Sequence, residues 1–387
     1  MAHEKICFKK SQLLVAAEAS YGVDPGSGYT AILTNSGIGI SPQSDRVARD
    51  VVRATFTPLP SITGATHWQL TATTELKGGG IDSTLQLPEI DLLLRGCAME
   101  RQSSLIVATT GLTGTFTPGE TVQNTTQTED VGIFVYSFTI GATTTLFLRG
   151  VTNPPTAADA LEGADSGATA TVSGTPETAY CYRPTSNCTG MTSLTQRFEI
   201  DGTIYKATGA LGTVEFNAQV GQFPTAAFTF SGLYNDPADQ ALSAVTYNRT
   251  KPERCVNMGL QIGNVDMAKL TATALQCNIA NDVQPVDDIN ATEGRSAIDI
   301  TGRKPTGSVD PSATSLATFN PWNYWKNNVS VGIHGKVGNA AGNKIWFVLP
   351  NCQPTEVGHQ DRNGRLAYNL PFELSGDGDD ELFLFFA

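Results

Sequence analysis

The sequence predicts an all-β fold of duplicated β-sandwich domains, with short flanking helices and one inserted small β module. Three observations lead to this prediction. Short runs rich in Thr, Val, Phe and Ile recur along the chain, with Gly, Pro and Asn between them, as in strands joined by turns. Apolar residues at helical spacing are scarce. Two short motifs also recur, in the same order, in the two halves of the 387 residues.

Individual elements follow from the local pattern. Two short helices are expected. Ser11 could cap a helix over residues 12–20, ended by Gly22 and Pro25. Pro88 with acids in the next turn and Gly96 beyond the end predict a second helix over residues 88–96. The clearest strands are expected at residues 68–76, 213–219, 226–230, 269–276, 329–334, 344–349, 366–374 and 382–386.

The repeated motifs indicate a duplication. Leu-Thr-Ala-Thr stands at residues 70–73 and 270–273, and Phe-x-x-Ser-Gly stands at 228–232 and 372–376. Each second motif follows a glycine, Gly221 or Gly364, at a similar distance. Coincidence is the alternative for matches this short. Duplication predicts a first domain formed by residues 1–103 and 176–250, and a second domain over residues 251–387.

The first half is longer between its motifs, which predicts an insertion. Composition places it at residues 104–175, a stretch rich in Thr, Gly and Ala in which Arg149 is the one basic residue. Gly-flanked strand patterns open and close this stretch. A single long loop is the alternative, but structureless loops beyond about 15 residues are uncommon. We therefore expect a small β module that projects from the main body.

Composition and motifs argue against an enzyme and against a nucleic-acid-binding protein. The formal charge is −12, and only 16% of residues are charged, so the chain lacks a basic footprint. No nucleophile elbow, phosphate-binding loop or His-Glu-x-x-His motif is present. The four histidines are scattered, and the three that lie in or beside predicted strands or turns are expected to be structural. The sequence thus predicts no catalytic residue and no cofactor.

Acidic and cysteine residues are also assigned structural roles. The acidic run at residues 377–381 lacks the spacing of a calcium loop, so a solvated turn is expected and no metal site. The seven cysteines include no zinc-type pair and are expected to be reduced and mostly buried. No apolar stretch reaches about 18 residues, and Glu18 ends the apolar run near the N-terminus, so we expect an unsecreted protein without a membrane partner.

Two aromatic segments are candidates for binding. Trp322, Tyr324 and Trp325 could stack on a sugar, although packing beneath a loop is the commoner role of such residues. The C-terminal strand has no polar alternation, so its two faces must be covered by its own core or by a neighbouring chain. The lack of charge favours assembly. The predicted assembly residues are Leu382, Phe383, Leu384, Phe385 and Phe386.

Several of these segments resemble one protein family. Residues 16–25, Ala-Ala-Glu-Ala-Ser-Tyr-Gly-Val-Asp-Pro, resemble the opening of tail tube (major tail) proteins of long-tailed, non-contractile bacteriophages, the siphophages. In that family a short Glu-containing helix runs into a Tyr-Gly-Thr/Val-Asp turn. Residues 88–97 resemble the family's helix between the sheets, and residues 209–232 resemble its Gly-Ala-x-Gly strand pair. The stretch 104–175 lies outside this pattern and resembles modules that decorate phage tails.

The resemblance implies a structural virion protein. Six two-sheet domains would close a ring, and rings would stack into a tail tube for double-stranded DNA. A duplicated chain needs three copies, so a trimeric ring with pseudo-six-fold symmetry is favoured over a hexamer. An acidic channel would repel DNA during ejection and bind none of it specifically.

The resemblance also implies partners and a location. The partners are the tape measure protein, the tail terminator and the distal tail or baseplate proteins. The location is the virion tail, after assembly in the host cytoplasm. Which residues face the lumen is unknown from the sequence. A carbohydrate-binding adhesin, a tail decoration protein and a β-rich hydrolase are the alternatives.

Overall fold

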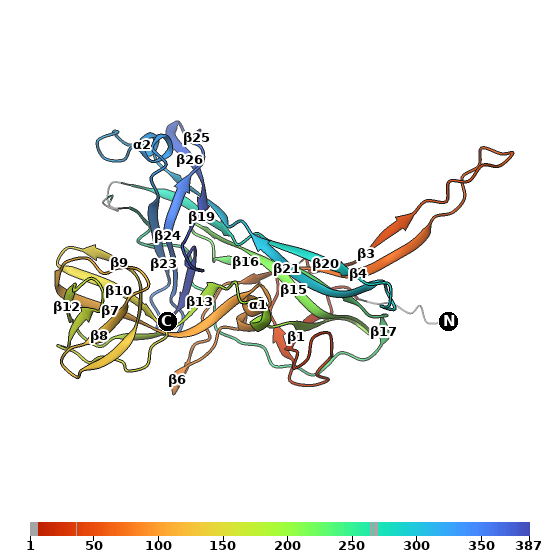
Figure 1. The fold of residues 1–387 in the computed structure, drawn as a ribbon, viewed down its shortest axis with the longest axis horizontal. Coiled ribbons are helices and arrows are strands. Elements are labelled where there is room, and N and C mark those ends of the chain that lie inside the picture. Colours follow the sequence, from red (N-terminus) through yellow and green to blue (C-terminus); the bar gives the residue numbers. More distant parts are fainter. Residues whose placement is uncertain (1–6, 36, 264, 266–269) are drawn as a thin grey trace.

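The computed structural model describes residues 7–35, 37–263, 265 and 270–387 (Figure 1). Strands hold 52% of the chain and helices 4%, in two short α-helices, which confirms the all-β prediction. The helices are α1 (Asp91–Gly96) and α2 (Pro321–Lys326). α1 starts later than the predicted 88–96 because residues 88–90 form the turn that precedes it, where the Asp91 N–H donates to the Pro88 carbonyl.

One long sheet runs through both halves of the chain. Its antiparallel order is β3–β4–β16–β15–β19–β22–β26–β25. The strands are β3 (Gly39–Val47), β4 (Ile62–Glu75), β15 (Thr203–Gln219), β16 (Thr225–Tyr234), β19 (Ala272–Asn278), β22 (Thr306–Pro311), β25 (Gly358–Arg362) and β26 (Arg365–Leu374). Four strands come from each half, and the halves join where β15 pairs with β19.

Other strands form the second layer. In the first half, β2 (Thr30–Ile32), β1 (Ser11–Ala17) and β14 (Leu194–Ile200) lead to the first part of β15. In the second half, β18 (Gln261–Ile262) and β23 (Val331–Val337) lead to β24 (Ile345–Pro354). The last strand, β27 (Phe383–Phe386), joins β24 to β13 (Glu177–Pro184).

The strand connections of the two halves follow the same plan. α2 directly precedes β23, whereas residues 97–193 separate α1 from β14. β14 then pairs with β15 and β23 pairs with β24, the strands that lead into the long sheet. The Phe-x-x-Ser-Gly motifs start on equivalent strands, β16 and β26. The Leu-Thr-Ala-Thr motifs do not occupy equivalent places, because residues 70–73 lie in β4 while 270–273 enter β19. β4 pairs directly with β16, whereas β22 separates β19 from β26.

The helix predicted over residues 12–20 is wrong. Residues 11–17 form strand β1, which pairs with β14 on one side and with β2 on the other. Leu13 and Val15 are buried on one face, and Leu14 and Ala16 are buried on the other. A strand covered on both faces shows no polar alternation, so its apolar run is easily read as a helix.

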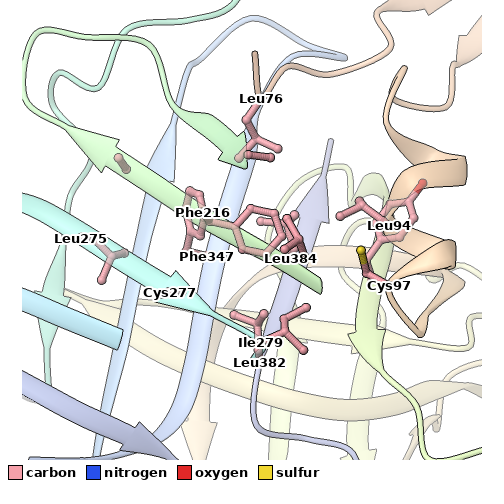
Figure 2. Packing of buried hydrophobic residues seen from close by; sticks show 14 of the residues in the cluster. Leu76, Leu94, Cys97, Phe216, Leu275, Cys277, Ile279, Phe347, Leu382 and Leu384 are labelled. Atoms are coloured by element: carbon pink, nitrogen blue, oxygen red, sulfur yellow. The ribbon is translucent and has the colours of Figure 1, made fainter. Parts of the chain in front are cut away.

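The predicted strands are otherwise found, with shifted ends. Residues 68–76, 213–219 and 226–230 fall in or beside β4, β15 and β16, and the five later segments overlap β19, β23, β24, β26 and β27. Residue 269, the first of one segment, lies outside the described residues. One hydrophobic cluster runs through both halves (Figure 2), where Phe216 of β15 meets Phe347 of β24 with ring centroids 6.2 Å apart.

The stretch 104–175 contains a closed barrel. Its strands pair in the circular order β7–β10–β9–β8–β11–β12 and back to β7. They are β7 (Met99–Thr113), β8 (Thr121–Asn124), β9 (Glu129–Ile140), β10 (Thr143–Arg149), β11 (Ala160–Gly163) and β12 (Thr169–Val172). The barrel has its own hydrophobic cluster, which includes Phe116, Phe134 and Leu146. It lies beside the main body in Figure 1.

Candidate functional site

The long sheet has one apolar face and one polar face. Phe216, Phe228 and Leu370 point into the core, as do the other residues of the same parity. The residues between them point the opposite way, because side chains alternate along a strand. Strand pairing and alternation place this second set on one side of the sheet: Gln69, Thr71, Thr73, Glu75, Thr213, Glu215, Asn217, Gln219, Thr225, Ala227, Thr229, Ser231, Ala274, Gln276, Asn278, Thr306, Ser308, Asp310, Asn369, Pro371 and Glu373. We call it the polar face.

Hydroxyls, amides and carboxylates dominate the polar face. Its acids are Glu75, Glu215, Asp310 and Glu373. The eight strands carry four basic residues, none of which belongs to the polar face: Arg46, Lys206, Arg362 and Arg365. Arg362 is paired with Asp310 at 2.7 Å. Glu215 accepts hydrogen bonds from the side-chain amides of Gln276 and Asn278. The polar face therefore carries carboxylates and no basic side chain of its own, a charge balance that repels phosphate groups.

The long sheet ends in two open edges. In the described part of the chain, β3 pairs with β4 and β25 pairs with β26, and no strand covers the other side of either one. The junction of the two halves shows how such edges can be joined, since β15 and β19 pair from Glu215↔Asn278 to Gln219↔Ala274. An exposed strand edge offers unpaired N–H and C=O groups to another strand.

The predicted assembly strand has its partners within the chain. Leu382, Phe383, Leu384, Phe385 and Phe386 are each at most 2% exposed. β27 pairs with β13 on one side and with β24 on the other. Its own core therefore supplies the cover that the apolar sequence requires. A direct role of this strand in assembly stays a prediction.

The aromatic candidates do not form a flat platform. The rings of Trp322 and Trp325 lie at 86° to each other, with centroids 6.3 Å apart. Trp325 donates its ring N–H to the Thr355 carbonyl at 3.0 Å, and Tyr324 packs on Phe319. Both tryptophans remain partly exposed, at 38% and 44%. An edge-on pair offers a sugar less stacking area than two coplanar rings.

Hydrogen bonds hold the N-terminal loop against the body of the protein. Glu18 accepts hydrogen bonds from Ser193, Thr195 and the backbone N–H groups of Gly22 and Gly209. Burial alone would raise the pKa of the Asp24 carboxyl. Hydrogen bonds from Tyr29, Arg197, Lys206 and the Gly26 backbone more than offset burial and hold that pKa below its usual range. These residues fasten the loop to β14 and β15.

The acidic turn at residues 377–381 joins β26 to β27, but it is not merely solvated. Arg303 binds both Asp379 and Glu381, the latter at 2.9 Å, and Arg183 donates to the Asp379 carbonyl at 3.3 Å. The sequence predicts only a solvated turn, because no local pattern indicates contacts with arginines that are distant in the chain. No group of three or more potential metal-binding side chains occurs in the described ranges.

Other sequence candidates are placed in separate surroundings. His67, His334 and His359 lie on three different strands, β4, β23 and β25, and His3 lies outside the described residues. All seven cysteines are free thiols, five of them buried, and Cys7 and Cys188 are exposed. None of the helices in the described residues has the length and apolarity to cross a membrane.

A family comparison matches nearly the whole chain. The matching family model is described as phage tail tube protein, and the match covers residues 9–374. None of the curated proteins matches the chain.

Proposed function

We propose that this chain, which belongs to the phage tail tube protein family, closes into three-copy rings that stack into a channel for DNA. Membership of the family makes it a structural protein of the virion tail. The observation that carries the proposal is the long sheet, which presents one open edge on each half and already contains a junction between the halves.

Ring closure would repeat the junction that the chain makes with itself. The β25 edge of one copy would pair with the β3 side of the next, as β15 pairs with β19. Eight strands from each of three copies give 24 strands. At a strand spacing of about 4.8 Å and a tilt of about 40°, that barrel would be roughly 48 Å across its backbone. Six copies would double the strand number and give a far wider ring.

The polar face would line the channel, because the opposite face is filled by the core. Each lysine or arginine that contacts a phosphate adds affinity for DNA and would slow its passage. Four acids stand on the polar face, and the residues that define it include no lysine or arginine. The surface therefore supports hydrated passage of double-stranded DNA without specific binding.

The barrel of residues 104–175 would lie outside the channel. A closed barrel has no free strand edge, so it cannot extend the sheet to another copy. It would decorate the outside of the tube. The tape measure protein, the tail terminator and the distal tail or baseplate proteins would meet the tube at its lumen and its ends, in a siphophage tail assembled in the host cytoplasm.

Purified protein tests the proposal directly. We expect native mass spectrometry to find three copies of the 41.0-kDa chain, and negative-stain micrographs to show rings with six similar lobes. Single chains at high concentration would refute the proposal, and a true hexamer would refute the three-copy ring.

Proline substitutions test the proposed edge. Gln360→Pro and Asp361→Pro each remove one N–H from β25, and neighbouring N–H groups point to opposite sides of a strand. One variant should lose a backbone hydrogen bond to β26 and should therefore melt at a lower temperature. The other should keep its melting temperature and lose ring formation. If both variants fold and form rings, β25 is not the joining edge.

A further inference from the structure

We infer that a hairpin arm of the first half, residues 46–61, docks on the second half of a neighbouring copy and holds the ring together. This inference rests on the proposed ring. The arm joins β3 to β4 and extends well beyond the body of the protein (Figure 1). Nearly all of its residues are exposed, including Val52 and Phe56, which retain their full side-chain surface. In the described part of the chain, nothing covers its tip.

The second half has an equivalent hairpin, and the structure shows where that one docks. It consists of β20 (Asn281–Asp287) and β21 (Arg295–Arg303), which lie between β19 and β22. The arm has the corresponding place in the first half, between β3 and β4. This hairpin packs across β15, β16 and β4 of the first half. Each half therefore carries a hairpin at the same place in its strand order, and one of them is seen docked on the half beside it.

The docked hairpin is held by specific contacts. Ile298 is fully buried, and its backbone N–H donates a hydrogen bond of 2.5 Å to the Tyr21 hydroxyl. The Thr66 N–H and hydroxyl donate to the carbonyl and carboxylate of Glu293. Arg295 pairs with Asp45, at the base of the arm, at 2.7 Å. The docked hairpin thus forms an ion pair with the residue that directly precedes the arm.

The ring supplies the same neighbour to the free arm. If β3 of one copy lies beside β25 of the previous copy, as β19 lies beside β15, the arm reaches that copy's second half. The charges of the two hairpins match this placement. Arg46, Arg49 and Arg53 outnumber Asp50 in the arm, although the whole chain carries −12. Residues 281–303 carry five acids and two arginines.

Charge reversal tests the inference. In Arg49→Glu/Arg53→Glu the two arginines are exposed, so the subunit should keep its melting temperature. Like charges would then face the neighbour's hairpin, and we expect the ring fraction at a fixed concentration to fall at least tenfold. Asp282→Lys/Asp288→Lys on the same chain should restore the rings, because it supplies the opposite charge to the altered arm. Arg249→Glu/Lys251→Glu is the matched control, because both side chains are exposed and lie outside the two hairpins and outside β3 and β25.

The outcomes separate this inference from the proposed ring. If the unaltered chain forms no ring, the proposed function fails. If the unaltered chain forms rings and the arm variant forms them equally well, the arm does not dock within the ring. Rings that form but no longer stack would place the arm between rings and overturn the inference. Loss of rings without rescue by the lysine variant would also overturn it, because the partner would not be the acidic hairpin.

Discussion

His334 is a buried histidine at the boundary between the barrel and the main body. It lies on β23 and is 1% exposed, stacked on Phe138 of the barrel with centroids 4.1 Å apart. Tyr136 lies 3.4 Å from its Nδ1, and its Nε2 has no partner among the described residues. Burial lowers the pKa of His334 to about 4. The neutral ring therefore belongs to the interface between the barrel and the main body.

This shift predicts a pH dependence of stability. The folded-state pKa lies below the unfolded value of about 6.5, so the unfolded chain binds the proton first as the pH falls. Stability attributable to His334 is present above about pH 6.5 and is lost between about 6.5 and 4, by up to roughly 3 kcal/mol. His334→Phe should lose less stability than the unaltered chain over that window, measured by denaturant unfolding. Parallel losses in both proteins would contradict the assignment.

At the scale of elements, β27 shows that an apolar pattern predicts cover on both faces of a strand but not where that cover comes from. Its apolar sequence required cover on both faces, and the sequence could not say whether the cover came from within the chain. Deletion of residues 382–387 should remove four buried side chains of β27 and the bonds to β13 and β24. Because each such side chain contributes about 2–5 kcal/mol, we expect an unfolded chain. A folded monomer lacking only assembly would restore the direct role.

The sequence predicted elements better than partners. Strands with one polar face, such as β4 and β16, were found because their period is visible. β1 was missed because both of its faces are buried. The sequence does not predict the polar face, although its residues alternate with core residues along each strand. Glu215 and Asn278 become neighbours only through the order of the strands in the sheet. Strand order comes from contacts between distant residues, which leave no local pattern.

At the scale of the whole molecule, the barrel and the main body are two cores with a shared boundary. Phe147 and Val135 of the barrel contact Val348 and Phe385 of the main body in a third cluster. β7 also continues past the boundary, because residues as far as Ile106 pair with β13. An excision of residues 104–175 would therefore cut a strand that the main body uses.

A corrected excision tests whether the barrel is separable. Replacing residues 109–174 with a short Gly-Ser bridge keeps the pairing of β7 with β13. The exposed boundary should lower the melting temperature by several degrees, because apolar surface returns to water. The chain should still form rings of the same symmetry, seen in micrographs without the outer lobes. If the barrel were needed for closure, the shortened chain would stay soluble and remain single.

The charge of the proposed channel can be tested without altering the fold. Thr71 and Asn217 are exposed on the polar face, and Thr71→Lys/Asn217→Lys would place six lysines in each three-copy ring. Assembly should be unchanged, because neither side chain is buried. Phosphate contacts release counterions, so DNA should co-sediment with the variant tubes at about 50 mM salt and dissociate by about 200 mM. Thr71→Gln/Asn217→Gln controls for side-chain size and should retain no DNA. If tubes with and without the lysines retain equal amounts, the polar face does not line the channel.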